Sequence, residues 1–499
     1  SLNQVTKQSS PDGGTSEFFY DRLGRLTISQ NAEQKTPRII NAENPANRYS
    51  YTRYDALGRI TEVGEKLGSS LIPTESDTRN QGWLDGWLLS GSNRQVTVTA
   101  YDIAPAWAPA PLAGTQKNLR KRVAASALLT TASPITNPSV NREAASYYSY
   151  DMVGNVHTLV QENPALAAIE AGSDGLKTIK YQFDLVSGKV NKVLYQDGKW
   201  DQFYYQYIYD ADNRVIKALS SRINYSDPGQ WVMEAFYRYY LHGPLARMEL
   251  GNSKVQGMDY AYTLQGWLKG VNSKVLDPNK DMSGDGLLTG PFTTVARDVL
   301  GFSLGYYNGD YSPVGGTGAG AFALQYQAPS YDPTGQVRNF ETGKNLYNGN
   351  IGHTTYAIKE IENGSTVGYT YRYDQLNRIT GMRRNNITAG ATVWSNSSII
   401  DAYKEEISYD ANGNIKTYLR NGADQPGLPP QMDQLTYGYS VDGNGRLVNN
   451  RLRHVNDQVA AGNYTEDIDN QGTDNYQYDN IGNLQSDAAE GLVHVNWTV

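Results

Sequence analysis

The sequence predicts an all-β protein in which antiparallel β-hairpins join into one continuous spiralling sheet, forming either a hollow shell or an open band. A few short helical insertions interrupt it. Three observations predict this fold. One seven-residue motif returns seven times, alternating aromatic residues precede its copies, and 38 Tyr accompany only 9 Phe in a chain that is 39% hydrophobic. Such a composition suits surfaces that are partly buried and partly exposed to solvent, because a Tyr ring packs against apolar groups while its hydroxyl forms a hydrogen bond.

The motif has the form Tyr, Asp, two variable residues, Gly or Asn, Arg or Asn, and an aliphatic residue, as in "YDALGRI" from Tyr54. The preceding alternation, for example "YSYTRYD", is typical of a strand. Asp begins a turn because its carboxylate can accept from nearby backbone N–H groups, and Gly or Asn tolerates the positive φ of a tight hairpin. The predicted turn residues are Tyr20, Asp21, Gly24, Tyr54, Asp55, Gly58, Tyr150, Asp151, Gly154, Tyr209, Asp210, Tyr373, Asp374, Tyr409, Asp410, Gly413, Tyr478, Asp479 and Gly482.

The spacing of the copies predicts a single repeat architecture. Neighbouring copies and their variants lie about 26 to 39 residues apart where the series is unbroken, which is typical of stacked repeats. We therefore expect residues 1–499 to form one β-shell region belonging to a longer protein, with insertions near residues 102–142, 163–175 and 276–330.

The number of repeats limits the shape of the sheet. Roughly fifteen two-strand repeats spaced about 4.8 Å apart give a sheet on the order of 140 Å wide. Open sheets beyond about ten strands curl or split. Curling once gives a ring on the order of 45 Å across, which is a band of one turn. We expect such a band to need flanking residues or partner chains to enclose a cargo.

The insertions carry their own signals. The Pro-Ala-rich residues 102–114 cannot form a central strand. The Gly-rich residues 312–326 lack the Lys-Ser/Thr of a phosphate-binding loop. Residues 163–172 and 292–301 are each predicted to form a short helix, since Gly flanks them and Pro stands near the start of the first.

Composition excludes several classes of protein. Lys and Arg number 44 against 51 Asp and Glu, so the chain lacks the basic balance of a dedicated nucleic-acid binder. Cysteine is absent, which removes disulfides and thiolate metal sites. No apolar run approaches the roughly 18 residues of a membrane span.

One loop has the pattern of a calcium site. Asp281, Ser283 and Asp285 alternate in "DMSGDG" and Gly286 follows, which matches positions 1, 3, 5 and 6 of a calcium loop. Position 12 is Phe292, so a complete EF-hand is excluded, while Asp277 and Asn279 offer further oxygens. Calcium is the candidate ligand, no cofactor is required by the sequence, and the alternative is an ordinary polar loop.

Tryptophan supplies a second candidate site. "QGWL" occurs twice, which places Trp83 and Trp267 in the same local sequence, and Trp87 follows the first copy. Exposed Trp faces can bind surface glycans. The alternative is that Trp after Gly packs where a strand bends.

Catalytic patterns are lacking. The histidines His157, His242, His353, His454 and His494 show no metal-ligand spacing. The repeated motif Asp residues have a structural explanation in the turn. We therefore predict that the chain is not an enzyme.

The motif, with "YAYTLQGWLKGVNS" (residues 260–273) and "FSLGYYNGDY" (residues 302–311), resembles the YD-repeat or Rhs proteins over residues 20–484, in the form found in large secreted Bacteroidetes proteins. Those proteins include polymorphic toxins, toxin-complex C components and teneurin shells. The resemblance implies a secreted or cell-surface wall that encloses or presents a C-terminal effector or toxin polypeptide. Its partners would be that segment or a protein of the secretion apparatus. The alternative is an adhesion module that binds surface glycans or a protein.

The family often closes its shell with a DPxGxxG-type segment that assists self-cleavage. Here Asp332, Pro333 and Gly335 lie mid-chain, with further repeats after them. We therefore do not assign the protease role to them.

Overall fold

The computed structural model describes residues 4–36, 47–68, 71–112, 114–130, 136–169, 174–313, 322, 325–327, 343–388, 390–391, 393–395, 399–423, 426–460, 464 and 467–497. Within these, 25 strands form one antiparallel sheet in which each strand except the first and the last pairs with the sheet strand before it and the one after it. The segment around Asp332 lies outside the described residues, as does most of the Gly-rich stretch.

The sheet is a meander in chain order. Its first part comprises β1 (Lys7–Ser10), β2 (Gly14–Tyr20), β3 (Leu26–Gln30), β4 (Arg48–Tyr54), β5 (Ile60–Leu67), β6 (Ser92–Tyr101), β7 (Val123–Leu129), β8 (Ala144–Tyr150), β9 (Val156–Glu162), β10 (Leu176–Phe183), β11 (Val190–Tyr195), β12 (Phe203–Tyr209) and β13 (Val215–Ser221). Its second part comprises β14 (Val232–Tyr239), β15 (Leu245–Leu250), β16 (Gln256–Tyr262), β17 (Leu268–Val271), β18 (Leu300–Gly305), β20 (His353–Ile358), β21 (Val367–Tyr373), β22 (Ile379–Asn386), β24 (Ile399–Tyr409), β25 (Ile415–Asn421), β26 (Gln431–Val441) and β27 (Leu447–Asp457). Two small pairs lie outside it, β19 (Gln325–Tyr326) with β23 (Val393–Trp394) and β28 (Tyr476–Tyr478) with β29 (Leu484–Asp487).

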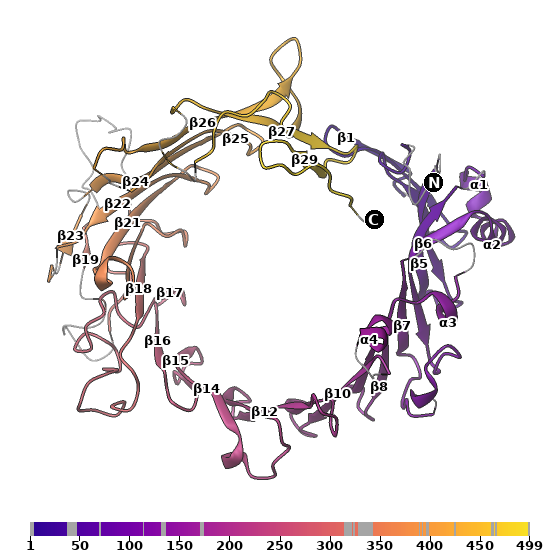
Figure 1. Cartoon of the computed structure of the whole chain (residues 1–499), viewed down its shortest axis with the longest axis horizontal. Helices are drawn as coiled ribbons and strands as arrows, with labels where there is room; N and C mark the ends of the chain where they lie inside the picture. The colour runs from indigo at the N-terminus through magenta and orange to yellow at the C-terminus, as the bar shows by residue number, and fades with distance from the viewer. Residues whose placement is uncertain are drawn as a thin grey trace.

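The meander curls through about one turn, so that β1 comes close to β27 and β29 (Figure 1). At about 4.8 Å per strand, 25 strands give a sheet about 120 Å wide, which is the circumference of a ring about 40 Å across. Among the described residues β1 pairs only with β2 and β27 only with β26, so the sheet stays open at this seam. The prediction of an open, one-turn band is confirmed.

Each copy of the motif forms the predicted turn. In the first, Asp21 N–H donates to the carbonyl of Arg25, and the Asp21 carboxylate accepts from the backbone N–H groups of Leu23 and Arg25. Its second oxygen accepts from Arg25 Nε at 2.7 Å. Gly24 has a φ of 79°, which a side chain would strain. The carboxylate is thus fully used inside the turn.

The motif also joins neighbouring hairpins. The Tyr54 hydroxyl donates to the carbonyl of Leu26 in the preceding hairpin at 2.8 Å, and the Arg25 guanidinium lies 4.4 Å from the centre of the Tyr54 ring. The same hydroxyl-to-carbonyl bond recurs at Tyr101, Tyr150, Tyr209, Tyr239, Tyr373 and Tyr409. Tyr and Arg therefore set the spacing between repeats, while Asp and Gly shape each turn.

Other turns have the same geometry without the full motif, and three of them depart from it in different ways. Asp102 N–H donates to the carbonyl of Arg122, so residues 103–121 are inserted inside one turn. Thr263 replaces Asp in a turn that ends at Trp267, and its hydroxyl accepts from the Trp267 N–H. Tyr240 occupies the Asp position in the third.

The helices are short and lie between strands. They are α1 (Glu75–Thr78), α2 (Gln81–Leu89), α3 (Pro138–Asn141) and α4 (Pro164–Ile169), with 3-10 turns η1 (Ala110–Leu112), η2 (Pro228–Gln230) and η3 (Glu362–Gly364). The prediction of a helix near residues 163–172 is confirmed by α4. The helix predicted at residues 292–301 is wrong: turns precede β18 there, because Phe292 packs 4.1 Å from the Arg247 guanidinium and Val295 is buried.

Candidate functional site

A group of buried carboxylates surrounds one arginine at the edge of β15 and β16. Arg247 on β15 is 3% exposed and donates to Glu249 at 3.1 Å, to Asp259 at 2.5 Å and to both oxygens of Asp285 at 2.8 and 3.0 Å. Lys254 adds a second cation, 3.3 Å from Glu249. Two cations, Arg247 and Lys254, therefore neutralise part of the charge of the three carboxylates Glu249, Asp259 and Asp285.

The loop predicted to bind calcium supplies part of this cluster. One Asp281 oxygen accepts from the backbone N–H groups of Ser283, Gly284 and Asp285, which folds the loop tightly around it. The Ser283 hydroxyl donates to Asp259 at 2.7 Å. The other predicted oxygen donors, Asp277 and Asn279, bond to each other.

Asp298 is a fourth aspartate of the cluster, and the sequence pattern gave no signal for it. It is 7% exposed and accepts from the Asn272 side chain at 3.0 Å. Burial, together with the carboxylates of Asp281 and Asp285, raises the pKa of Asp298 to about 9. Burial also raises the pKa of Asp285 to about 6, against the opposing effect of Arg247.

This arrangement carries more negative charge than its cations neutralise. Oxygens of Asp259, Asp281 and Asp285 lie within 4.8 Å of one another, and the Asp281 carboxylate also interacts with the carboxyl of Asp298. At neutral pH such a group holds either a proton on Asp298 or a bound cation. The residues present fit a hard, oxygen-seeking cation, with Asp259 in the role that Ser283 was predicted to fill. Calcium binding itself stays a prediction.

The tryptophans predicted to bind ligand lie in different surroundings. "QGWL" at residues 81–84 begins α2 instead of marking a bent strand, because the Asn80 side chain accepts from the Trp83 N–H and caps a helix. Trp87 is fully buried, stacks on Trp83 at 6.2 Å and meets Tyr49 edge-on at 5.7 Å. It therefore has no ring face open to a ligand in this structure.

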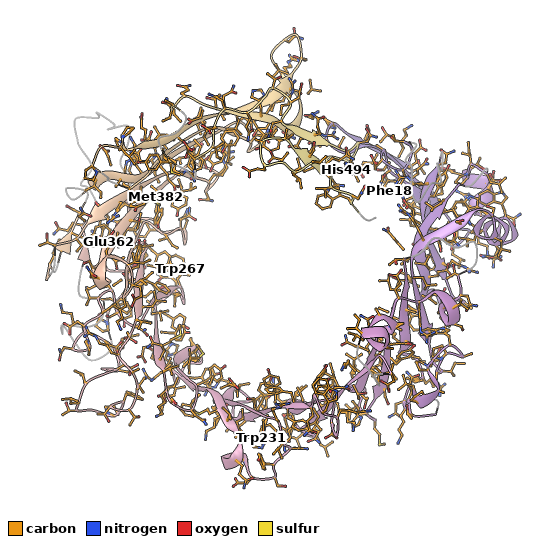
Figure 2. The ribbon with its side chains drawn as sticks, viewed as in Figure 1. Phe18, Trp231, Trp267, Glu362, Met382 and His494 are labelled. Atoms are coloured by element: carbon orange, nitrogen blue, oxygen red, sulfur yellow. The ribbon has the colours of Figure 1, made fainter. Side chains whose placement is uncertain are left out.

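Trp267 lies in the Thr263 turn, half-buried, with its ring 4.9 Å from that of Tyr306 (Figure 2). Trp83 is likewise half-buried and packs on the cluster of Ile28, Tyr49, Tyr51, Leu84 and Trp87. A ligand-binding role for Trp83 and Trp267 stays a prediction, and the two residues lie on separate elements, Trp83 on α2 and Trp267 in the turn before β17.

Within the described part of the chain, only the aspartate cluster brings together three or more acidic, His or Cys side chains that could hold a metal ion. None of the five histidines takes part in it. The same part of the chain has no helix long and apolar enough to cross a membrane.

No protein-family model matches the sequence, and no curated protein does. Three solved toxin structures align over most of the chain. A TcdB2-TccC3-Cdc42 structure covers 92% of this chain and 20% of that chain at 11% identity and a TM-score of 0.38. A TcdB2-TccC3-TEV structure covers 96% of this chain and 24% of that chain, at 13% identity and a TM-score of 0.25. The Photorhabdus luminescens Tc holotoxin pore with a TccC3 mutation covers 97% of this chain and 24% of that chain, at 12% identity and a TM-score of 0.24. The chain spans about a fifth to a quarter of the length of these solved chains.

Proposed function

We propose that this chain is a non-catalytic wall segment of a secreted or cell-surface protein, and that the wall encloses or presents an effector polypeptide. One observation carries the proposal: a single 25-stranded sheet curls through about one turn, and the described side chains leave the centre of the ring open (Figure 2). A compact domain would fill that centre with a hydrophobic core.

The chemistry of the repeats supports a structural role. Every motif Asp donates its N–H to the carbonyl four residues on, and its carboxylate accepts hydrogen bonds from within the same turn. Five of the motif Tyr hydroxyls donate to a carbonyl of the preceding strand segment, those of Tyr54, Tyr150, Tyr209, Tyr373 and Tyr409. The motif Asp carboxylates and these Tyr hydroxyls are thus used in making the wall.

The shape also limits what this chain does alone. One turn of sheet is open above and below, so a polypeptide in its centre would remain accessible to solvent. Flanking sequence, or a protein of the secretion apparatus, is needed to complete the enclosure. The wall therefore acts together with other segments.

The test uses the full native polypeptide. Its intact mass and C-terminal peptide establish whether another segment accompanies the wall, and limited proteolysis then compares that segment with and without the wall. We expect strong protection by the wall. A native polypeptide with no accompanying segment, or one whose segment is cut at equal rates in both forms, would overturn the proposal.

A further inference from the structure

A tyrosine-lined cavity of about 510 Å³ lies across β20 to β26. Its walls include Tyr356, Tyr369, Tyr371 and Tyr403, with Met382 and Glu405 between them. Figure 2 marks Met382 in the part of the ring where Figure 1 shows β21, β22 and β24. This cavity is separate from the aspartate cluster and from the tryptophans.

The register of the strands brings these side chains together. Met382 on β22 is opposite Tyr371 on β21 and opposite Glu405 on β24. Side chains directly opposite each other in an antiparallel pair share one face of the sheet. The tyrosine rings and the Glu405 carboxylate therefore converge on the same face.

The tyrosines form an ordered aromatic wall. The rings of Tyr356 and Tyr369 stack with centres 5.7 Å apart and planes 14° apart. The Tyr371 hydroxyl is 3.2 Å from that of Thr354, which holds the third ring in place. Burial raises the pKa of Tyr369 and of Tyr371, so these rings remain neutral and electron-rich at physiological pH.

Glu405 and Arg420 are the two charged side chains that line the cavity. The Arg420 guanidinium, on the facing strand, is committed to the fully buried carboxylate of Asp433 at 2.5 Å. Nearby Arg383 pairs with Glu406, and Arg384 pairs with Glu362. Among the described residues Glu405 has no ion pair within 4.0 Å, and its carboxylate lies close enough to Tyr418 to raise the pKa of that hydroxyl, together with burial.

We propose that this cavity binds a small organic ammonium ion, with the charge facing Glu405 and the alkyl groups against the tyrosine rings. Aromatic faces attract cations through the ring quadrupole, and cages of such rings recognise quaternary ammonium groups. A metal ion would need several convergent oxygens, whereas one carboxylate among aromatic rings suits a bulky, weakly hydrated cation. This inference is independent of the wall function.

The test compares choline with its neutral isostere 3,3-dimethylbutan-1-ol, which has the same shape without the charge. Binding to the whole chain is measured by ligand-observed NMR titration. We expect choline to bind about tenfold more tightly than the isostere. Equal affinities, or no choline binding at concentrations up to about 100 mM, would overturn the proposal, and neither outcome requires a variant.

Two substitutions locate the site. Glu405→Gln keeps the shape and removes the charge, and Tyr371→Leu removes an aromatic face; each should weaken choline binding about tenfold. Glu490→Gln, an exposed glutamate outside the cavity, is the matched control and should change nothing. Folded variants that bind choline as the unsubstituted chain does would refute this location.

Discussion

The carboxylate of Asp12 accepts hydrogen bonds from both the backbone N–H and the side-chain amide of Asn450, at 2.6 and 2.7 Å, across 438 positions of sequence. The Arg451 guanidinium also donates to the Asp12 carbonyl. Close by, Asn480 donates its backbone N–H to Glu33 at 3.2 Å. These contacts join the two ends of the sheet and the adjoining β28–β29 pair, where the described residues show no strand pairing.

Asp12→Ala should loosen this seam without unfolding the wall, because the strand pairing of all 25 strands stays intact. We expect faster amide hydrogen exchange in β1 and β27 and little change in melting temperature. Asp212→Ala, at an exposed aspartate in the turn between β12 and β13, is the control. Unchanged exchange in both strands would show that the seam does not depend on Asp12.

Gly58→Ala should destabilise the chain by about 1–2 kcal/mol, because Gly58 has a φ of 79° and a Cβ is strained in the left-handed region. Gly58→Asn should cost less, since Asn213 and Asn377 occupy the same turn position with a φ of 62°. Chemical denaturation of the two variants measures the difference. Equal costs would mean that the backbone conformation is not what limits this position.

The seven turns could be predicted because each is written in seven consecutive residues. The turn between Asp102 and Arg122 could not, because residues 103–121 separate its two halves, and only the folded strands β6 and β7 bring them together. The structures that the two "QGWL" copies adopt could not be predicted for a related reason. Their letters are alike, but Asn80 caps a helix before the first, while Thr263 closes a hairpin turn at the second.

The aspartate cluster was only partly predictable. Asp281 and Asp285 lie in one loop and carry a recognisable spacing. Asp259 on β16 and Asp298 before β18 enter through sheet register and through the Asn272 side chain, which donates to Asp298 and accepts from the Asp259 N–H. Arg247 was missed because its role depends on the same long-range geometry.

Acid should weaken the repeats in a defined pH range. The backbone N–H of Arg214 donates to Asp210 and lowers the pKa of its carboxyl, and Arg378 does the same for Asp374. A lowered pKa in the folded state stabilises the protein above the unfolded value of about 4, and this stabilisation is lost as the pH falls below it.

Melting temperature measured from pH 7 to pH 2 should therefore fall mainly below about pH 4. Asp210→Asn, which removes the titrating group from one turn, should melt lower at neutral pH and show a shallower acid dependence. An acid dependence as steep as in the unsubstituted chain would show that this carboxylate does not contribute.

Trp87→Ala should cost about 3–5 kcal/mol, because it removes a fully buried ring from the core under α2. Trp267→Ala, at a half-buried ring, should cost less. Urea denaturation gives both values. A Trp87→Ala variant as stable as the unsubstituted chain would contradict the packing role of this residue.

Calcium should raise the melting temperature through the aspartate cluster. The cation would relieve the repulsion between the buried carboxylates, and a ligand at about 100 times its Kd stabilises the folded state by about 2.7 kcal/mol. Asp281→Asn retains an oxygen for the backbone N–H groups of Ser283, Gly284 and Asp285 but removes the charge, so it should abolish the calcium-dependent rise. Thermal unfolding in millimolar calcium and in chelator makes the comparison, with Asp469→Asn as the control. If Asp281→Asn and the unsubstituted chain shift equally with calcium, the ion binds elsewhere and the cluster is held by a proton on Asp298.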